Sequence, residues 1–157
     1  MVGQAGISEG QAMHTCIAIA PDGTPYISYT DGARDNKITT LKYAGGAWAA
    51  VGAVGRSPYF ASSVSMAFGT DGVLYTGYAG TSGCRVERFT NGAWEQLGVE
   101  SDFYNARTAS LAVGRDGAVY MAYLDGSNDF GGGMRKYVGE AWEQVGPLTF
   151  TNTEASM

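Results

Sequence analysis

The stretch Met66-Ala67-Phe68-Gly69-Thr70-Asp71-Gly72 decides the fold, because variants of it occur three times in the chain. Its counterparts are Ile17-Ala18-Ile19-Ala20-Pro21-Asp22-Gly23 and Leu111-Ala112-Val113-Gly114-Arg115-Asp116-Gly117. The three Asp-Gly pairs are 49 and 45 residues apart, which gives a mean period of 47. Self-similarity at such a period indicates a repeat architecture in which each repeat is one supersecondary unit.

Further positions recur in register downstream of each Asp-Gly pair. Two tyrosines three residues apart follow in every copy, and an aromatic residue then precedes a tryptophan by five residues. Alternating side chains and frequent turn dipeptides predict short β-strands and no helices. We therefore predict an all-β chain with four antiparallel strands per repeat. The recurring residues are Tyr26 and Tyr29, Tyr75 and Tyr78, Tyr120 and Tyr123, then Tyr43, Phe89 and Tyr137, and finally Trp48, Trp94 and Trp142, each Trp leading to an apolar-Gly pair (51–52, 97–98, 145–146).

The predicted turns give each sheet one constant and one variable edge. The first and second strands meet through Asp-Gly, and the third and fourth through Gly-Gly, Asn-Gly or Gly-Glu, at constant loop lengths. Asp-Gly, Asn-Gly and Gly-Gly suit tight hairpins because both central residues can take positive φ. The loops between second and third strands and the linkers between repeats vary in length. Variable loops on a rigid scaffold commonly carry binding residues, so we expect any ligand at that edge.

Repeats of this length, with four antiparallel strands each, resemble β-propeller blades. The likeness is nearest to bacterial propellers described as sialidase-like or lectin-like, although no Trp-Asp dipeptide, kelch double glycine or sialidase Asp-box identifies a family. The resemblance implies one β-propeller segment over residues 1–157. Its blades are expected at 16–52, 65–98 and 110–146, with linkers at 4–15, 53–64, 99–109 and 147–157.

Three blades are too few to close a ring, because closed propellers typically have about 4–8. An open arc would expose two apolar blade faces, which soluble monomers rarely tolerate. We therefore expect oligomerisation to complete the ring, and favour a homodimer with six blades over a homotrimer with nine. Residues 1–3 match only the tail of a fourth strand, as in a piece cut from a longer array, and this alternative stays open.

Charge and composition exclude several classes of protein. Fifteen acidic against ten basic residues give a net charge of −5, which argues against binding to nucleic acid or anionic membranes. No apolar run approaches the ~18 residues of a transmembrane helix, and no signal peptide is visible. No phosphate-binding or dinucleotide fingerprint occurs, so we expect no cofactor. These features predict a soluble protein and leave its compartment unassigned.

Signals for catalysis or metal binding are weak. His14 is the single histidine, and no cysteine or carboxylate lies at metal-ligand spacing from it, so we predict no metal site. One loop contains Asp125, Asn128 and Asp129, whose oxygens suit Ca²⁺, but a solvated turn is the favoured interpretation. The two cysteines have the pattern of small buried or semi-buried thiols rather than nucleophiles. We assign no catalytic residues and favour a non-enzyme.

The linkers between repeats place adjacent aromatic residues on the variable edge. Tyr59-Phe60 lies in one linker, and Phe103-Tyr104-Asn105 with Arg107 follows in the next. Aromatic rings beside polar groups are typical of sugar-binding pockets, yet the same rings could plug the gap between blades, and the two interpretations are about even. The candidate ligand-binding residues are His14, Tyr59, Phe60, Phe103, Tyr104, Asn105, Arg107, Asp125 and Asp129.

The sequence thus predicts an oligomeric β-propeller binding module, with carbohydrate as the favoured ligand class. One alternative is a fragment or relative of a sialidase-like glycoside hydrolase, which would need a pair of carboxylates. Asp31, Asp125 or Glu9 could supply them, but nothing in the chain selects a pair. The other alternative is a protein-interaction scaffold without catalytic activity.

Overall fold

In the computed structural model, which describes residues 6–147, three four-stranded antiparallel sheets follow one another along the chain. This confirms the all-β class and the three predicted blades, whereas completion of a ring stays a prediction. The described part of the chain adds only two 3-10 helices, and it contains no helix long and apolar enough to cross a bilayer. The elements are β1 (Ala12–Ile19), β2 (Pro25–Asp31), η1 (Gly32–Arg34), β3 (Lys37–Ala44) and β4 (Ala47–Ala50); β5 (Ala61–Phe68), β6 (Leu74–Gly80), β7 (Cys84–Thr90) and β8 (Ala93–Gln96); and η2 (Glu100–Phe103), β9 (Ala106–Val113), β10 (Val119–Asp125), β11 (Gly131–Val138) and β12 (Ala141–Gln144).

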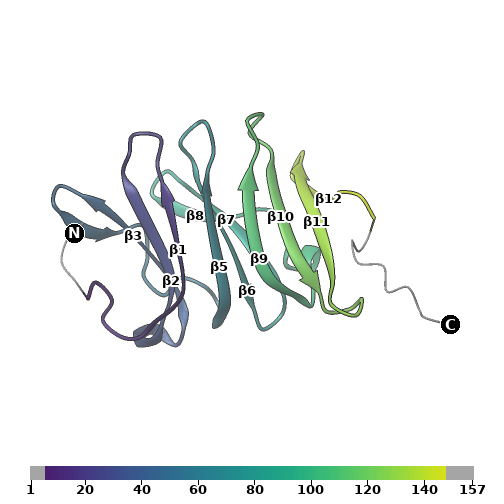
Figure 1. Ribbon diagram of the computed structural model, residues 1–157, viewed down its shortest axis with the longest axis horizontal. Coiled ribbons are helices and arrows are strands. Elements are labelled where there is room, and N and C mark those ends of the chain that lie inside the picture. The colour runs from purple at the N-terminus through teal and green to yellow at the C-terminus, as the bar shows by residue number, and fades with distance from the viewer. Residues whose placement is uncertain (1–5, 148–157) are drawn as a thin grey trace.

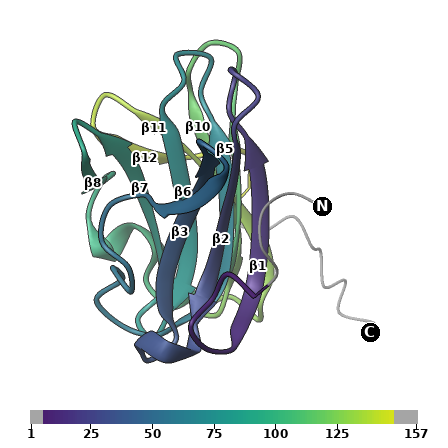
Figure 2. The ribbon, with the colours of Figure 1, turned by 90° about the vertical axis from the view of Figure 1, so that its left-hand side faces the viewer.

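The three sheets stand side by side (Figure 1). The largest clusters of buried apolar side chains combine residues of neighbouring sheets. Strand β5 packs against both β1 and β9, so the first strands of the three blades are neighbours. Figure 2 shows β1 on one side of the molecule and the last strands β8 and β12 on the other. Val51 of the first blade packs with Met66 of the second, and Val86 of the second packs with Met121 of the third. Each blade therefore buries its faces only against another blade.

The two kinds of hairpin differ in a way that the sequence did not predict. Between β7 and β8, Asn91 and Gly92 both have positive φ, at 51° and 81°, as expected. In the Asp-Gly hairpins only the glycine does, for example Gly72 at 79°. Those loops are longer, since the Gly69 N–H donates to the Val73 carbonyl and the Gly72 N–H to the Gly69 carbonyl. A single left-handed glycine suffices for such a loop.

The first strand of each blade begins earlier than predicted, at Ala12, Ala61 and Ala106. Each has an irregular register near its start, and His14 and Thr108 there have positive φ, at 48° and 51°. A bulge of this kind breaks the strict alternation of side chains, which hides the strand in the sequence. His14 is therefore a strand residue and does not lie in a linker.

The recurring tryptophan and apolar-Gly pair form one hydrogen bond between neighbouring blades. The Trp94 Nε1 donates to the Val51 carbonyl at 2.9 Å, and the Trp142 Nε1 donates to the Leu97 carbonyl at 2.9 Å. The glycine after each acceptor has a φ of 72° or 73° and lies under the indole. A Cβ added at Gly52 would stand 2.8 Å from the Trp94 ring. This arrangement explains why the two elements recur together.

Gly52→Ala should destabilise the protein more than Gly72→Ala. Both glycines have left-handed φ, which costs an alanine about 1–2 kcal/mol. Only Gly52 also faces an indole, whereas an added Cβ at Gly72 meets nothing within 4 Å. The clash should add about 1–3 kcal/mol, measured as the free energy of unfolding in urea. Equal losses for the two variants would contradict the role of Gly52 in the junction.

Candidate functional site

The two junctions between blades share this hydrogen bond but are filled differently. Between the second and third blades, Phe103 lies edge-to-face against Tyr123 and Trp142, with ring centroids 5.3 and 4.9 Å apart. The Phe103 side chain is buried, and the Arg135 guanidinium lies 5.6 Å from its centroid. Aromatic packing therefore closes this junction. The burial favours the packing interpretation of Phe103 over a contact with ligand.

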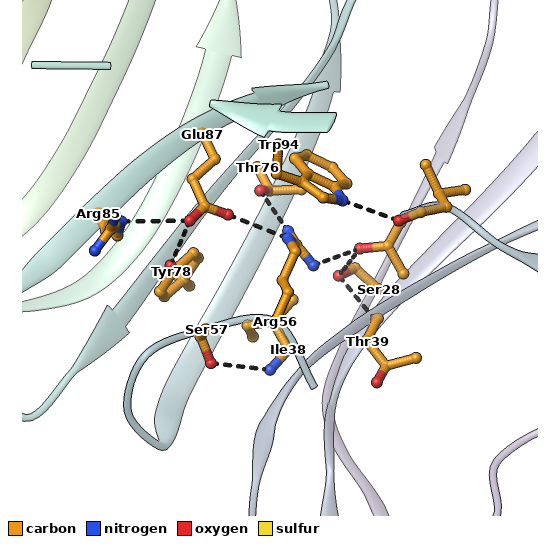
Figure 3. A network of polar contacts seen from close by, with 12 residues as sticks. Ser28, Ile38, Thr39, Arg56, Ser57, Thr76, Tyr78, Arg85, Glu87 and Trp94 are labelled. Atoms are coloured by element: carbon orange, nitrogen blue, oxygen red, sulfur yellow. Dashed lines mark hydrogen bonds and ion pairs between the residues drawn. The ribbon is translucent and has the colours of Figure 1, made fainter. Parts of the chain in front are cut away.

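Between the first and second blades, a charged residue lies over the tryptophan instead. The Arg56 guanidinium carbon is 3.8 Å from the Trp94 ring centroid. Arg56 Nε donates to Glu87 Oε2 at 3.1 Å, and its terminal nitrogens donate to the Thr40 and Thr76 hydroxyls at 2.9 and 2.7 Å (Figure 3). One linker side chain thus joins β3 of the first blade to β6 and β7 of the second.

The Glu87 carboxylate is the centre of the same network. Its Oε1 accepts a hydrogen bond from the Tyr78 hydroxyl at 2.8 Å and lies 3.3 Å from Arg85 Nε (Figure 3). The side chains of Arg56 and Glu87 are only 5% and 8% exposed. Burial lowers the pKa of Arg56, which the Glu87 charge opposes, and burial next to Glu87 raises the pKa of Tyr78. The guanidinium still carries its charge and the phenol stays neutral near pH 7.

This network is not what packing alone requires. Removing two ions from water costs several kcal/mol each, and well-packed apolar side chains of similar volume often stabilise a protein equally well. The neighbouring junction, where Phe103 packs on Trp142, shows that the same scaffold accepts an aromatic filling. Buried ionisable groups next to a cleft are candidates for function. We therefore take the first junction as the candidate functional site.

The linker that carries Arg56 is held in place by its backbone. Residues 51–60 run along the edge of β3, where the Arg56 N–H donates to the Ile38 carbonyl at 2.9 Å. The Ser57 hydroxyl accepts from the Ile38 N–H at 3.1 Å and donates to the Tyr59 carbonyl at 2.8 Å. Tyr59 is 54% exposed, yet its backbone position is fixed by these bonds.

Two clefts flank this linker, and Pro58 and Arg85 line both of them. Counted with the space that opens to solvent, the first cleft measures about 380 Å³ and the second about 900 Å³. The first combines aromatic walls with a short loop, and the second reaches the buried ionic network. Besides the shared residues, the first is lined by Tyr59, Phe60, Tyr78, Gly80, Thr81, Ser82, Gly83 and Cys84, and the second by Gly52, Ala53, Arg56, Glu87, Gly92, Ala93 and Trp94.

Of the nine predicted ligand-binding residues, only Tyr59 and Phe60 line these clefts. The Asp125 side chain accepts from the Ser127 N–H and from the Asn128 amide, as in a polar turn. No group of three His, Cys, Asp or Glu side chains among the described residues could hold a metal ion. The structure brings the second linker beside the loop of Asp125, since the Asn105 carbonyl accepts from the Gly126 N–H. The other predicted residues lie outside both clefts: His14 and Arg107 are exposed on β1 and β9, Tyr104 and Asp129 are exposed in loops, Asn105 is half-buried in the second linker, and Phe103 is in the core.

Sequence reasoning missed Arg56, Glu87 and the ring of Trp94 as parts of one site. The available signal was a departure from the repeat. The sheet register aligns Glu87 with Leu41 in the first blade and Arg135 in the third. The second blade thus has a carboxylate at a core position where the first blade has leucine. Apolar packing would not select a carboxylate there, so another requirement must explain it.

Cys84 is a buried thiol and Cys16 a half-buried one, as the sequence suggested. Burial raises the pKa of Cys16 to about 11 and that of Cys84 to about 12. The Cys84 thiol also donates to the Thr108 carbonyl at 3.1 Å. Because the thiolate is the nucleophile, neither group is activated near neutral pH.

Comparison with known proteins places this fold among solved structures. No family model and no curated protein sequence matches the chain. It is similar to a fucose lectin from Kordia zhangzhouensis in complex with methyl-fucoside, at 12% identity and a TM-score of 0.57, over 85% of this chain and 99% of that one. It is also similar to the Aleuria aurantia lectin with α-methyl-L-fucoside, at 15% identity and 0.53, over 88% and 47%. A third is the GH93 α-L-arabinofuranosidase of Fusarium graminearum, at 13% identity and 0.62, over 96% and 52%.

The fold is that of a β-propeller. Three four-stranded antiparallel blades match propeller-type lectins and glycoside hydrolases, which confirms the resemblance inferred from the repeats. The chain spans almost the whole Kordia zhangzhouensis lectin and about half of the other two proteins. Fold does not fix function, so the chemistry rests on the site.

Loss of both partners of the buried pair should cost less than the sum of the two single losses. Arg56→Met leaves the Glu87 carboxylate buried without its main counter-ion and should lower the free energy of unfolding by about 3–5 kcal/mol. The double variant Arg56→Met/Glu87→Leu should lose clearly less than the sum of the two single variants. Urea unfolding measures all three.

The exposed pair Arg88–Glu95, 3.1 Å apart, provides a matched control. Arg88→Met should cost less than about 1 kcal/mol because water screens both groups. Additive losses for the buried pair would show that Arg56 and Glu87 act independently.

Both thiols should react slowly with a disulfide reagent at about pH 8 in the folded protein, because the raised pKa values keep them protonated. Denaturation returns them to an ordinary pKa near 8.5 and should release both for rapid reaction. A fast phase of one thiol in the native protein would contradict the raised pKa of that thiol.

Proposed function

We propose that this chain is a carbohydrate-binding protein whose site is the pair of clefts between the first and second blades. The observation that carries the proposal is the exposed pair Tyr59–Phe60, held beside Arg85 at the edge of the buried Arg56–Glu87 network. The two lectins similar in fold were solved with fucosides, which supports a sugar as ligand.

The residue types suit a sugar for a physical reason. A pyranose has apolar C–H faces and a rim of hydroxyls, so its site needs a ring to stack on and a few polar groups. Tyr59 and Phe60 provide exposed rings. Arg85 carries a planar fork of donors, and loop 80–83 adds backbone groups at the same cleft. The site therefore offers both kinds of contact within one short segment.

The buried network prepares the site before any ligand binds. Glu87 contacts Arg85 and so orients the guanidinium that both clefts share. Fixing side chains and linker in advance reduces the entropy lost on binding.

An enzyme of the glycoside hydrolase type is the second candidate, because a propeller arabinofuranosidase is among the similar structures. Most such enzymes need two carboxylates on either side of the scissile bond. Among the described residues that line the two clefts, Glu87 is the single carboxylate, and it is bound to Arg56, Arg85 and Tyr78. These contacts favour binding over hydrolysis.

Tyr59→Ala should weaken sugar binding about tenfold, which corresponds to about 1.4 kcal/mol of lost stacking. A glycan array selects the ligand, and titration calorimetry with methyl-fucoside, arabinobiose and the best array glycan measures the dissociation constant. Because Tyr59 is exposed, the variant should unfold at the temperature of the unaltered protein.

Tyr104→Ala is the matched control, since Tyr104 is equally aromatic, is exposed in the second linker and lies outside both clefts. The Tyr104→Ala variant should bind the sugar with the affinity of the unaltered protein. Loss of binding in Tyr104→Ala but not in Tyr59→Ala would move the site to the other linker. Failure of every glycan to bind would refute the proposal and favour a protein-interaction scaffold.

A further inference from the structure

The outer face of the first blade carries residues that the other blades bury. Ile17, Met66 and Leu111 occupy the same position in the three repeats. Met66 and Leu111 face the preceding blade and are 8% exposed each, whereas Ile17 is 69% exposed. Ile19, two residues further along β1, is 57% exposed. The first blade thus has the large apolar residues of a junction, but in the described chain no other blade covers them.

The outer face of the third blade carries the complementary half. In the second blade, Ser65 Oγ accepts a hydrogen bond from the Leu111 N–H of the third blade at 3.1 Å. The third blade repeats this serine as Ser110, which is exposed. Ala67 packs into the core between the second and third blades, while its counterpart Ala112 is exposed. The acceptor and the small side chain of a junction are therefore both repeated on this face.

The backbone carbonyl that accepts the tryptophan N–H is repeated in the third blade as well. The Val145 N–H donates to the Met134 carbonyl at 2.9 Å, as the Leu97 N–H does to Val86, and Gly146 has the same left-handed φ, 74°. Trp94 and Trp142 already use Val51 and Leu97. Trp48 is the remaining tryptophan of the series, and it is half-buried.

We propose that the third blade of one copy docks on the first blade of a second copy, through the contacts that join blades within the chain. The two halves lie at opposite ends of the arc of blades (Figure 1), so one molecule cannot join them to each other. Ser110 would accept from the Ile17 N–H of the partner copy, and Ile17 would pack on Ala112. Two copies joined head to tail close a ring of six blades, within the usual range of about 4–8.

The site between the first and second blades lies within one chain, so this docking is independent of the proposed function. The two half-faces also predict a specific polarity. A symmetric pairing of two first blades would bring Ile17 against Ile17 and leave Ser110 and Ala112 unused. Head-to-tail docking needs one face of each kind at every contact.

Light scattering coupled to size exclusion tests the docking on the full chain. The unaltered protein should have twice the chain mass of 16.5 kDa. Ile17→Asp and Ala112→Lys should each shift it to the mass of one chain, because a buried unpaired charge disrupts each contact. An equimolar mixture of the two variants should return to the mass of two chains, since one contact of the mixed ring is unaltered and the other pairs the new carboxylate with the new ammonium group.

Val99→Asp is the matched control, because Val99 is an exposed apolar residue in the linker between the second and third blades, away from both outer faces. It should keep the mass of the unaltered protein, and circular dichroism should show all three variants folded. A mass of three chains would keep the docking and replace six blades by nine. An unaltered protein with the mass of one chain, or a mixture that fails to associate, would overturn the proposal.

Discussion

The hydrogen bond from a tryptophan indole to the carbonyl of the preceding blade is the constraint on which the rest of the structure depends. A four-stranded sheet of this size cannot bury its own faces, so stability comes from the junctions. The Trp94 N–H reaches the Val51 carbonyl only because the chain turns left-handed at Gly52 and leaves room for the ring. The contact therefore fixes how far apart neighbouring blades stand, and the linkers and first strands follow from that distance.

Once this distance is fixed, the space beside the tryptophan can hold different side chains. Phe103 fills it with an aromatic ring at one junction, and Arg56 fills it with a guanidinium at the other. The aromatic filling needs nothing further, whereas the guanidinium requires Glu87 and two threonine hydroxyls to satisfy its donors. One scaffold thus accommodates an inert junction and a polar one, and the polar one lies beside the clefts.

The same repetition gives the molecule two unlike ends. At the junction between the second and third blades, a small residue with an acceptor meets a large apolar residue of the next blade, as Ser65 pairs with Leu111. The first and third blades each keep the half that no other described blade covers, with Ile17 at one end and Ala112 at the other. Repeat proteins usually cover such ends with capping units, which makes exposed half-junctions unusual in a stable chain.

The sequence by itself determined the blade count, the strand order and the tight turns between third and fourth strands, because these depend on periodic residues and on local backbone preferences at positions such as Asn91-Gly92. It also indicated that Tyr59 and Phe60 lie on the variable edge. Only the tertiary structure decided that Phe103 is buried, that His14 lies in a bulged strand, and that Arg56 meets Glu87 from 31 residues away. The physical reason is that residues required at every junction recur with the period of the repeat and are therefore visible in the sequence. A contact made at one junction only depends on distances between side chains far apart in the chain, which the repeat does not specify.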